Sequence, residues 1–169
     1  MGTTRLVSRR RQDSGAKWAR IAMAVLATAG LIDTGSITLK RWGLLGNLTC
    51  PMGADGCDKV LNSAWGTVFA GIPLSLVGVL AYGAVLLMAL LPLLPGLQEN
   101  KGDLSRRTWW GLFTVSLGMA VFSGVLLGVM LLKIQAFCFF CVLSAALSLA
   151  LFVLSIFGGG WEDVGQLLF

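Results

Sequence analysis

Apolar residues are grouped in four long runs along the chain. The runs cover roughly residues 21–39, 73–94, 109–132 and 138–157. Each is close to the ~20 residues that a helix needs to cross the hydrocarbon core of a bilayer, and none shows the strict alternation of a membrane β-strand. Because a helix satisfies its own backbone hydrogen bonds in hydrocarbon, the pattern predicts an all-α integral membrane protein, a bundle of four transmembrane helices.

A long polar segment, residues 40–72, separates the first two runs and forms the predicted outer loop. Residues 47–56 are rich in Gly, Pro, Asn and Asp, which predicts an irregular stretch. In residues 58–68 apolar positions return at helical spacing, which predicts a short amphipathic half-helix at the membrane surface. Residues 71–73 then break the chain, and the proline suits the first turn of the second spanning helix.

Small residues inside the predicted helices indicate close helix packing. Gly78 lies in the second helix, and Gly124 and Gly128 lie one turn apart in the third. Such residues let two helix backbones approach each other in a membrane.

The composition excludes a soluble globular domain. Hydrophobic residues make up 56% of the 169 residues and charged residues 12%, and the mean hydropathy is +0.83. The net charge of +5 is concentrated ahead of the first apolar run, which is a topology signal and not a nucleic-acid-binding face. We therefore divide the chain into a basic cytoplasmic arm (1–20), a membrane domain (21–157) and a C-terminal tail (158–169), with both termini cytoplasmic.

An alternative for the N-terminus is a cleaved signal peptide, formed by the basic arm, a short apolar core and the small residues 27–29. The apolar run continues to residue 39, however, and is long enough to span a bilayer. Either interpretation leaves the loop 40–72 on the outer side.

All four cysteines fall on the predicted outer side, in a compartment where disulfides form and persist. Cys50 and Cys57 lie in the loop, and Cys138 and Cys141 begin the last run. The latter two share a helix face and can form a disulfide. Cys138 is expected at the helix N-terminus, where the macrodipole stabilises a thiolate.

Two dithiol pairs on one side of the membrane predict a relay by thiol–disulfide exchange. Purely structural disulfides are an alternative, and a zinc site is disfavoured by the long Cys50–Cys57 spacing and the absence of His. The sequence lacks nucleotide-binding, iron–sulfur and haem signals, so a lipid-soluble quinone remains as the electron acceptor by elimination. The rival from another class is a small four-helix transporter or scaffold, and the last three runs lack the mid-membrane charge typical of transporters.

Several short motifs occur along the chain in a distinctive order. They are Cys50-Pro51 through Gly56-Cys57, Asn62-Ser63, Trp65-Gly66, Gly71-Ile72-Pro73-Leu74 and Phe137-Cys138-Phe139-Phe140-Cys141. In this order they resemble the bacterial branch of the vitamin K epoxide reductase family.

The resemblance implies a membrane thiol:quinone oxidoreductase with a four-helix bundle around the quinone. Cys138 and Cys141 would form the active-site disulfide, with Cys141 nearest the quinone, and Cys50 and Cys57 would be the shuttle pair. Ser63, Phe137 and Cys141 would border the quinone, which is of the ubiquinone, menaquinone or phylloquinone type. No metal is implied.

The resemblance also implies a thioredoxin-like partner in the periplasm or lumen, and a role in disulfide formation. Many relatives carry a fifth helix and a fused thioredoxin-like domain, which these 169 residues lack. Either the partner is a separate protein, which we expect, or these residues are part of a longer protein; no nucleic-acid partner is expected. The location implied is the bacterial inner membrane or the thylakoid membrane.

Two polar residues within the apolar runs have open roles. Asp33 lies about 18 Å along the first helix from Ile21, at 1.5 Å per residue, where a carboxylate can relay protons, pair with a cation or be hydrated. Tyr82 can hydrogen-bond a quinone or serve packing. Neither is assigned to the site.

Overall fold

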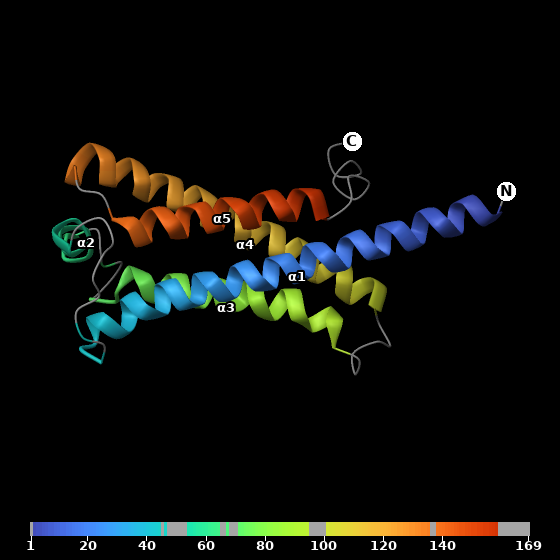
Figure 1. Cartoon of the computed structure of the whole chain (residues 1–169), viewed down its shortest axis with the longest axis horizontal. Helices are drawn as coiled ribbons and strands as arrows, with labels where there is room; N and C mark the ends of the chain where they lie inside the picture. The colour runs from blue at the N-terminus through green and yellow to red at the C-terminus, as the bar shows by residue number, and fades with distance from the viewer. Residues whose placement is uncertain are drawn as a thin grey trace.

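The computed structural model describes residues 2–44, 46, 54–64, 67, 71–94, 101–135 and 138–158. Four long helices lie side by side (Figure 1): α1 (Gly2–Arg41), α3 (Leu74–Leu90), α4 (Lys101–Val129) and α5 (Phe139–Gly158). Each contains a segment long and apolar enough to cross a membrane, and many large apolar side chains point outward. The predicted all-α membrane bundle is confirmed.

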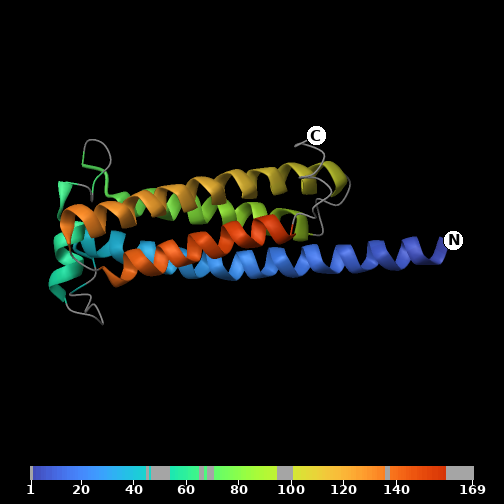
Figure 2. The same ribbon diagram turned by 90° about the horizontal axis from the view of Figure 1, so that it is seen from above.

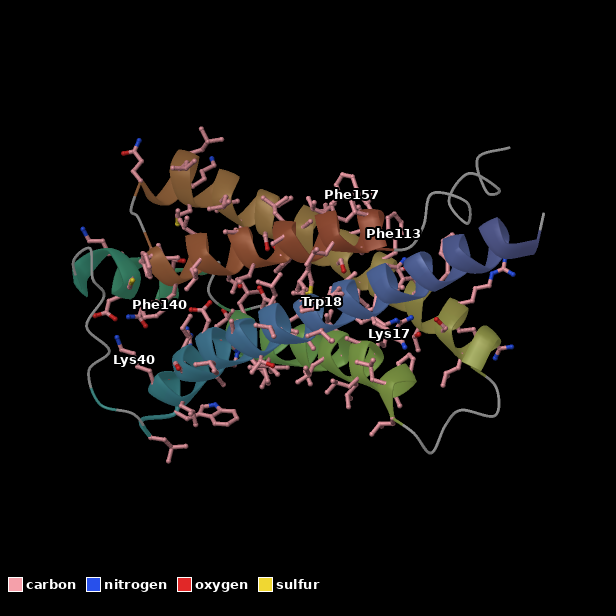
Figure 3. All side chains as sticks on the ribbon, turned by 45° about the vertical axis from the view of Figure 1, so that its right-hand side comes forward. Lys17, Trp18, Lys40, Phe113, Phe140 and Phe157 are labelled. Atoms are coloured by element: carbon pink, nitrogen blue, oxygen red, sulfur yellow. The ribbon has the colours of Figure 1, made fainter. Side chains whose placement is uncertain are left out.

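The helices alternate in direction, so the start of α1 and the end of α5 lie at one end of the bundle. Helix α2 (Ala54–Leu61), the start of α3 and the start of α5 lie at the other end (Figures 1 and 2). Lys40 and Phe140 lie at this α2 end (Figure 3). At the opposite end α1 projects beyond its neighbours (Figure 2), so the N-terminal arm continues the first helix.

Helix α2 is the predicted half-helix with shifted boundaries. It begins at Ala54, so the last part of the stretch expected to be irregular is helical. Alanine is the best helix former, and this signal was hidden among glycines. The helix ends at Leu61 and is followed by a turn at Asn62, whose N–H donates to the carbonyl oxygen of Asp58 (3.0 Å). The prediction that the half-helix continues to residue 68 is wrong for residues 62–64 and 67, which lie beyond the end of α2; Thr67 forms an isolated antiparallel bridge with Pro73. Residues 65, 66 and 68 lie outside the described residues.

Helices α1 and α3 pack closely because glycines face larger side chains. A Cβ on Gly30 of α1 would fall on the ring of Tyr82, and a Cβ on Gly78 of α3 would lie 2.8 Å from Cγ2 of Thr34. Both positions therefore require glycine at this separation of the helices, and the packing role predicted for Gly78 is confirmed.

The same prediction is wrong for Gly124 and Gly128. A Cβ added at either position would meet no neighbouring atom within 4 Å. These glycines of α4 lie where the helix is only loosely packed, and spacing along one helix does not reveal whether a partner helix faces it.

Polar side chains link the helices within the apolar bundle. The Thr38 hydroxyl of α1 donates to Ser75 Oγ of α3 (2.9 Å), and the Ser148 hydroxyl of α5 donates to Ser123 Oγ of α4 (3.0 Å). Such bonds satisfy groups that lipid cannot, and they fix the helices relative to one another.

Arg20 ties three helices together at the end that carries the termini. It is buried, and its guanidinium donates to the carbonyl oxygens of Met88 (3.3 Å) and Ser105 (3.1 Å) and to the hydroxyl of Thr108 (3.3 Å). It also lies over the ring of Trp109, 5.0 Å from the centroid. The charge of this residue is thus satisfied by backbone oxygens, a hydroxyl and an aromatic face.

Candidate active site

A sharp change of direction positions the last cysteine pair. Helix α4 ends in a π-helical turn, η4 (Met130–Ile134), and Gln135 follows with a left-handed φ of 50°. Its N–H donates to the carbonyl oxygen of Met130 (2.9 Å), which closes the turn. Cys138 then precedes α5, and its carbonyl oxygen accepts the N–H of Val142 (3.1 Å). The expected position of Cys138 at a helix N-terminus is confirmed.

Cys138 and Cys141 are free thiols in different surroundings. Cys138, just ahead of the membrane-spanning segment, is fully buried. A hydrogen bond from the Cys141 thiol is the main cause that lowers the pKa of Cys138 to about 7; burial opposes it, and the backbone N–H groups of Cys141 and Phe140 assist. Helix-terminal N–H groups favour a thiolate in the same way elsewhere. The Cys138 thiolate is therefore stabilised relative to that of an ordinary cysteine.

A cysteine of the outer loop is brought to this pair. Cys57, 2% exposed, forms a buried cluster with Met130 and Cys138, and Cys141 packs against it. The cluster arises because α2 packs on η4. Cys57 is itself disulfide-bonded. Residues more than 80 positions apart in the sequence thus meet at one end of the bundle.

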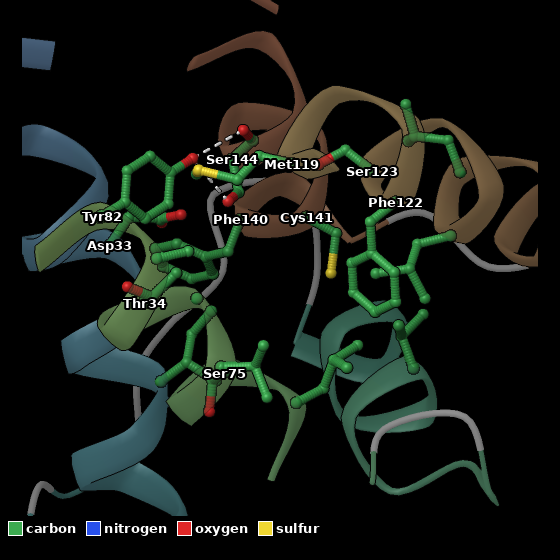
Figure 4. Close-up of a pocket in the computed structure, with 18 of the residues that line it drawn as sticks. Asp33, Thr34, Ser75, Tyr82, Met119, Phe122, Ser123, Phe140, Cys141 and Ser144 are labelled. Carbon is green, nitrogen blue, oxygen red and sulfur yellow. Dashed lines mark hydrogen bonds between the residues drawn. The ribbon is translucent and has the colours of Figure 1, made fainter. Parts of the chain in front are cut away.

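A cavity of about 460 Å³ opens beside the thiols and is bordered by residues of all four long helices. Its walls are mostly apolar, and Cys141 lines it. Figure 4 shows the Cys141 sulfur pointing into the cavity, with Phe122 on one side and Phe140 on the other. Cys141 therefore borders both the thiol cluster and the cavity.

Tyr82 and Asp33 form a polar wall of the cavity. The Tyr82 hydroxyl donates to the Ser144 carbonyl oxygen (2.9 Å) and lies 3.1 Å from Ser144 Oγ. Asp33 is 6% exposed, and its two carboxyl oxygens are buried with no hydrogen-bond partner among the described residues. The sequence assigned neither residue to the site, although a polar residue within an apolar run was the signal that marked each of them.

The structure brings together four of the six residues that the sequence named for the site. Cys57, Cys138 and Cys141 are grouped, and Ser63 lines the cavity while its hydroxyl donates to the Val60 carbonyl oxygen (2.7 Å). The other two, Cys50 and Phe137, lie outside the described residues. In the described ranges no three Cys, Asp or Glu side chains are grouped as a metal site requires.

Comparison with known proteins places this bundle in a family. Residues 21–156 match the sequence profile of the vitamin K epoxide reductase family. The chain is also similar to the thiol-disulfide oxidoreductase LTO1 of Arabidopsis thaliana, with 31% identity over 146 residues. That alignment covers 82% of this chain and 36% of the plant protein, so the chain spans about a third of its relative's length. The chain therefore belongs to the vitamin K epoxide reductase family.

Proposed function

We propose that the protein is a membrane thiol:quinone oxidoreductase that oxidises a thioredoxin-like partner and so supports disulfide formation. The observation that carries the proposal is the position of Cys141, which packs against the buried cluster of Cys57 and Cys138 and also lines the apolar cavity. Sulfur atoms thus lead from the outer loop to the cavity.

The cavity fits a quinone in size and chemistry. Its volume of about 460 Å³ lies in the range of small-molecule sites. Polar groups, among them those of Asp33, Tyr82 and Ser63, interrupt apolar walls, and the Asp33 carboxyl has no hydrogen-bond partner among the described residues. A flat apolar molecule with oxygen atoms suits this combination. A quinone bound there would accept two electrons and two protons.

Two thiol–disulfide exchanges would transfer electrons from the partner to the Cys138–Cys141 pair. A reduced thioredoxin-like partner attacks the shuttle disulfide at Cys57, whose burial against η4 requires α2 to move first. The attack releases Cys50 as a thiolate, and the partner leaves oxidised when its second thiol resolves the mixed disulfide. Cys50 then attacks Cys138 in its disulfide with Cys141, and Cys57 resolves that bond. Each exchange moves two electrons. The last exchange leaves Cys138 and Cys141 as thiols, with Cys141 beside the cavity.

The low pKa of Cys138 favours this cysteine as the leaving group in the last disulfide exchange. A thiolate is the better leaving group when its pKa is low, and the hydrogen bond from Cys141 stabilises the Cys138 thiolate. When Cys57 attacks Cys50 and re-forms the loop disulfide, the low pKa therefore favours Cys138 as the leaving sulfur.

We further propose that the α2 end faces the periplasm or lumen and that both termini are cytoplasmic. The basic N-terminal arm supports this orientation. Two exposed positions at opposite ends test it, Asn62 and Arg106. After the native thiols are blocked, an impermeant maleimide added outside intact cells is expected to label Asn62→Cys and to spare Arg106→Cys. The reverse pattern would refute the orientation.

The catalytic proposal is tested with purified protein in lipid nanodiscs. With a quinone and a reduced thioredoxin-like protein, the wild type is expected to form quinol and oxidised partner in equal amounts. Cys138→Ala and Cys141→Ala are expected to abolish quinol formation. Val142→Ala, on the outward face of α5, is the matched control and should retain it. Quinol formation that persists in both cysteine variants would reject the mechanism.

The loop pair is tested separately. Cys57→Ala is expected to lose oxidation of the protein partner while a small dithiol still reduces the Cys138–Cys141 disulfide and drives quinol formation. If no variant or wild type forms quinol, and loss of a disulfide only lowers stability by about 2–5 kcal/mol, the cysteines brace a scaffold instead.

A further inference from the structure

Asp33 on α1 is an acidic side chain that is buried and borders the cavity. It lies in the membrane-spanning part of the helix, is 94% shielded from solvent and borders the cavity. Neither carboxyl oxygen has a hydrogen-bond partner among the described residues. Buried polar groups in proteins are nearly always bonded, so this carboxyl group is available to hydrogen-bond a molecule in the cavity.

The neighbouring hydroxyls do not supply that partner. The hydroxyl of Tyr82 donates to Ser144, and the hydroxyl of Ser63 donates to Val60. Thr34, next to Asp33 on α1, donates to the carbonyl oxygen of Gly30 (2.7 Å). These three hydroxyls are therefore engaged within the protein, whereas the Asp33 carboxyl oxygens have no hydrogen-bond partner among the described residues.

The apolar surroundings of Asp33 affect the ionised and the protonated carboxyl group differently. An unpaired carboxylate in an apolar, water-poor site is costly, whereas a protonated carboxyl donates one hydrogen bond and accepts others. Asp33 and Cys141 border the same cavity, and Figure 4 shows the Phe140 side chain between them. The cavity is thus bordered by a thiol on α5 and by a carboxyl group on α1.

We propose that Asp33 is the proton donor of this cavity: it hydrogen-bonds an oxygen of the bound quinone and protonates it as Cys141 delivers electrons. This inference rests on the proposed function. Formation of the Cys138–Cys141 disulfide releases two electrons and two protons, and reduction of the quinone to quinol consumes two of each. Asp33 gives one proton to the quinone and regains one from the Cys141 thiol, so its own balance is zero. The second proton of the quinol comes from solvent and replaces the proton that Cys138 released to solvent when it ionised.

The test uses Asp33→Asn, which keeps the size and polarity of the side chain but cannot donate an acidic proton. Quinol formation is expected to fall roughly a hundredfold, the scale of general acid catalysis. Exchange between the partner and the enzyme disulfides, measured without quinone, is expected to be unchanged. Thr28→Val, on the exposed face of α1, is the matched control.

A spectroscopic readout does not depend on turnover. In infrared difference spectra, addition of quinone to the wild type is expected to shift the carbonyl band of a protonated carboxyl group, and Asp33→Asn is expected to lack that band. Asp33→Glu, which restores an acid, is expected to regain part of the rate. It also serves if Asp33→Asn does not fold.

Different results refute the proposed function and the role of Asp33. If the wild type forms no quinol, the proposed function fails. If the wild type forms quinol and Asp33→Asn does so equally fast, or if no carboxyl band responds to quinone, the role of Asp33 is refuted while the proposed function stands.

Discussion

The hydroxyl of Tyr82 donates a hydrogen bond of 2.9 Å to the carbonyl oxygen of Ser144, three residues after Cys141 on α5. Tyr82 is 1% exposed, and its ring fills the space that Gly30 leaves on α1. One side chain of α3 therefore holds both the first and the last helix of the bundle, directly beside the cavity.

Removal of that hydroxyl in Tyr82→Phe is expected to lower the free energy of unfolding by about 1 kcal/mol, the usual net value of one hydrogen bond. Denaturant unfolding in a fixed detergent measures it. Thr114→Val removes a hydroxyl that bonds only within exposed α4 and is expected to change stability less. An equal loss in both variants would show that the bond between helices adds nothing.

Substitution of Arg20, at the other end of the bundle, is expected to lower the free energy of unfolding by a larger amount. Arg20→Met removes the hydrogen bonds that a buried guanidinium donates to Met88, Ser105 and Thr108. Because hydrogen bonds of charged groups are each worth about 1.5–3 kcal/mol, we expect a loss of at least about 2 kcal/mol in unfolding free energy. Lys17→Met, at an exposed position on the same helix, provides the comparison. Similar stability of the two variants would contradict this role.

The ion pair between Lys40 and Asp58 links α1 to α2 with an N–O distance of 2.9 Å, next to Cys57 in sequence. Asp58 is half exposed, and such surface pairs contribute less than about 1 kcal/mol. Lys40→Gln is therefore expected to leave global stability nearly unchanged but to speed amide hydrogen exchange in α2. The charge-reversed pair, Lys40→Asp with Asp58→Lys, is expected to restore slow exchange. Exchange in α2 that ignores both changes would show that packing on η4 alone holds the helix.

The sequence predicted the features that depend on local patterns. The apolar runs predicted four spanning helices, and the C-x-x-C spacing predicted two thiols at the head of the last one. These signals are visible because bilayer thickness and helix periodicity act on neighbouring residues.

Features that depend on contacts between distant segments were not predictable. Nothing local distinguishes Gly78, which faces Thr34, from Gly124, which faces open space. The cavity role of Tyr82 depends on Gly30 and Ser144, which come from two other helices. The start of α2 at Ala54 was obscured by the adjacent glycines, because its helical signal is short and its packing on η4 is nonlocal.

The lowered pKa of Cys138 predicts how the reduced protein responds to pH. One thiol is expected to ionise near pH 7, seen as thiolate ultraviolet absorbance, and Cys138→Ala is expected to lose this transition. Cys141→Ala removes the hydrogen bond that is the largest cause of the shift, so the Cys138 transition is expected to move up toward pH 9.

The lowered pKa of Cys138 also makes the unfolding free energy depend on pH. The folded-state pKa of Cys138 lies below that of an unfolded cysteine, so between about pH 7 and pH 9 the unfolded chain binds more protons and the unfolding free energy rises with pH. This contribution is complete above pH 9 and is lost as the pH falls through about 7. Reduced wild type is therefore expected to gain stability relative to Cys138→Ala over that window, and less of the gain is expected in Cys141→Ala. If thiolate absorbance rises only near pH 9 in both wild type and Cys141→Ala, the Cys141 thiol does not stabilise the Cys138 thiolate, and the preference for Cys138 as the leaving sulfur loses its physical basis.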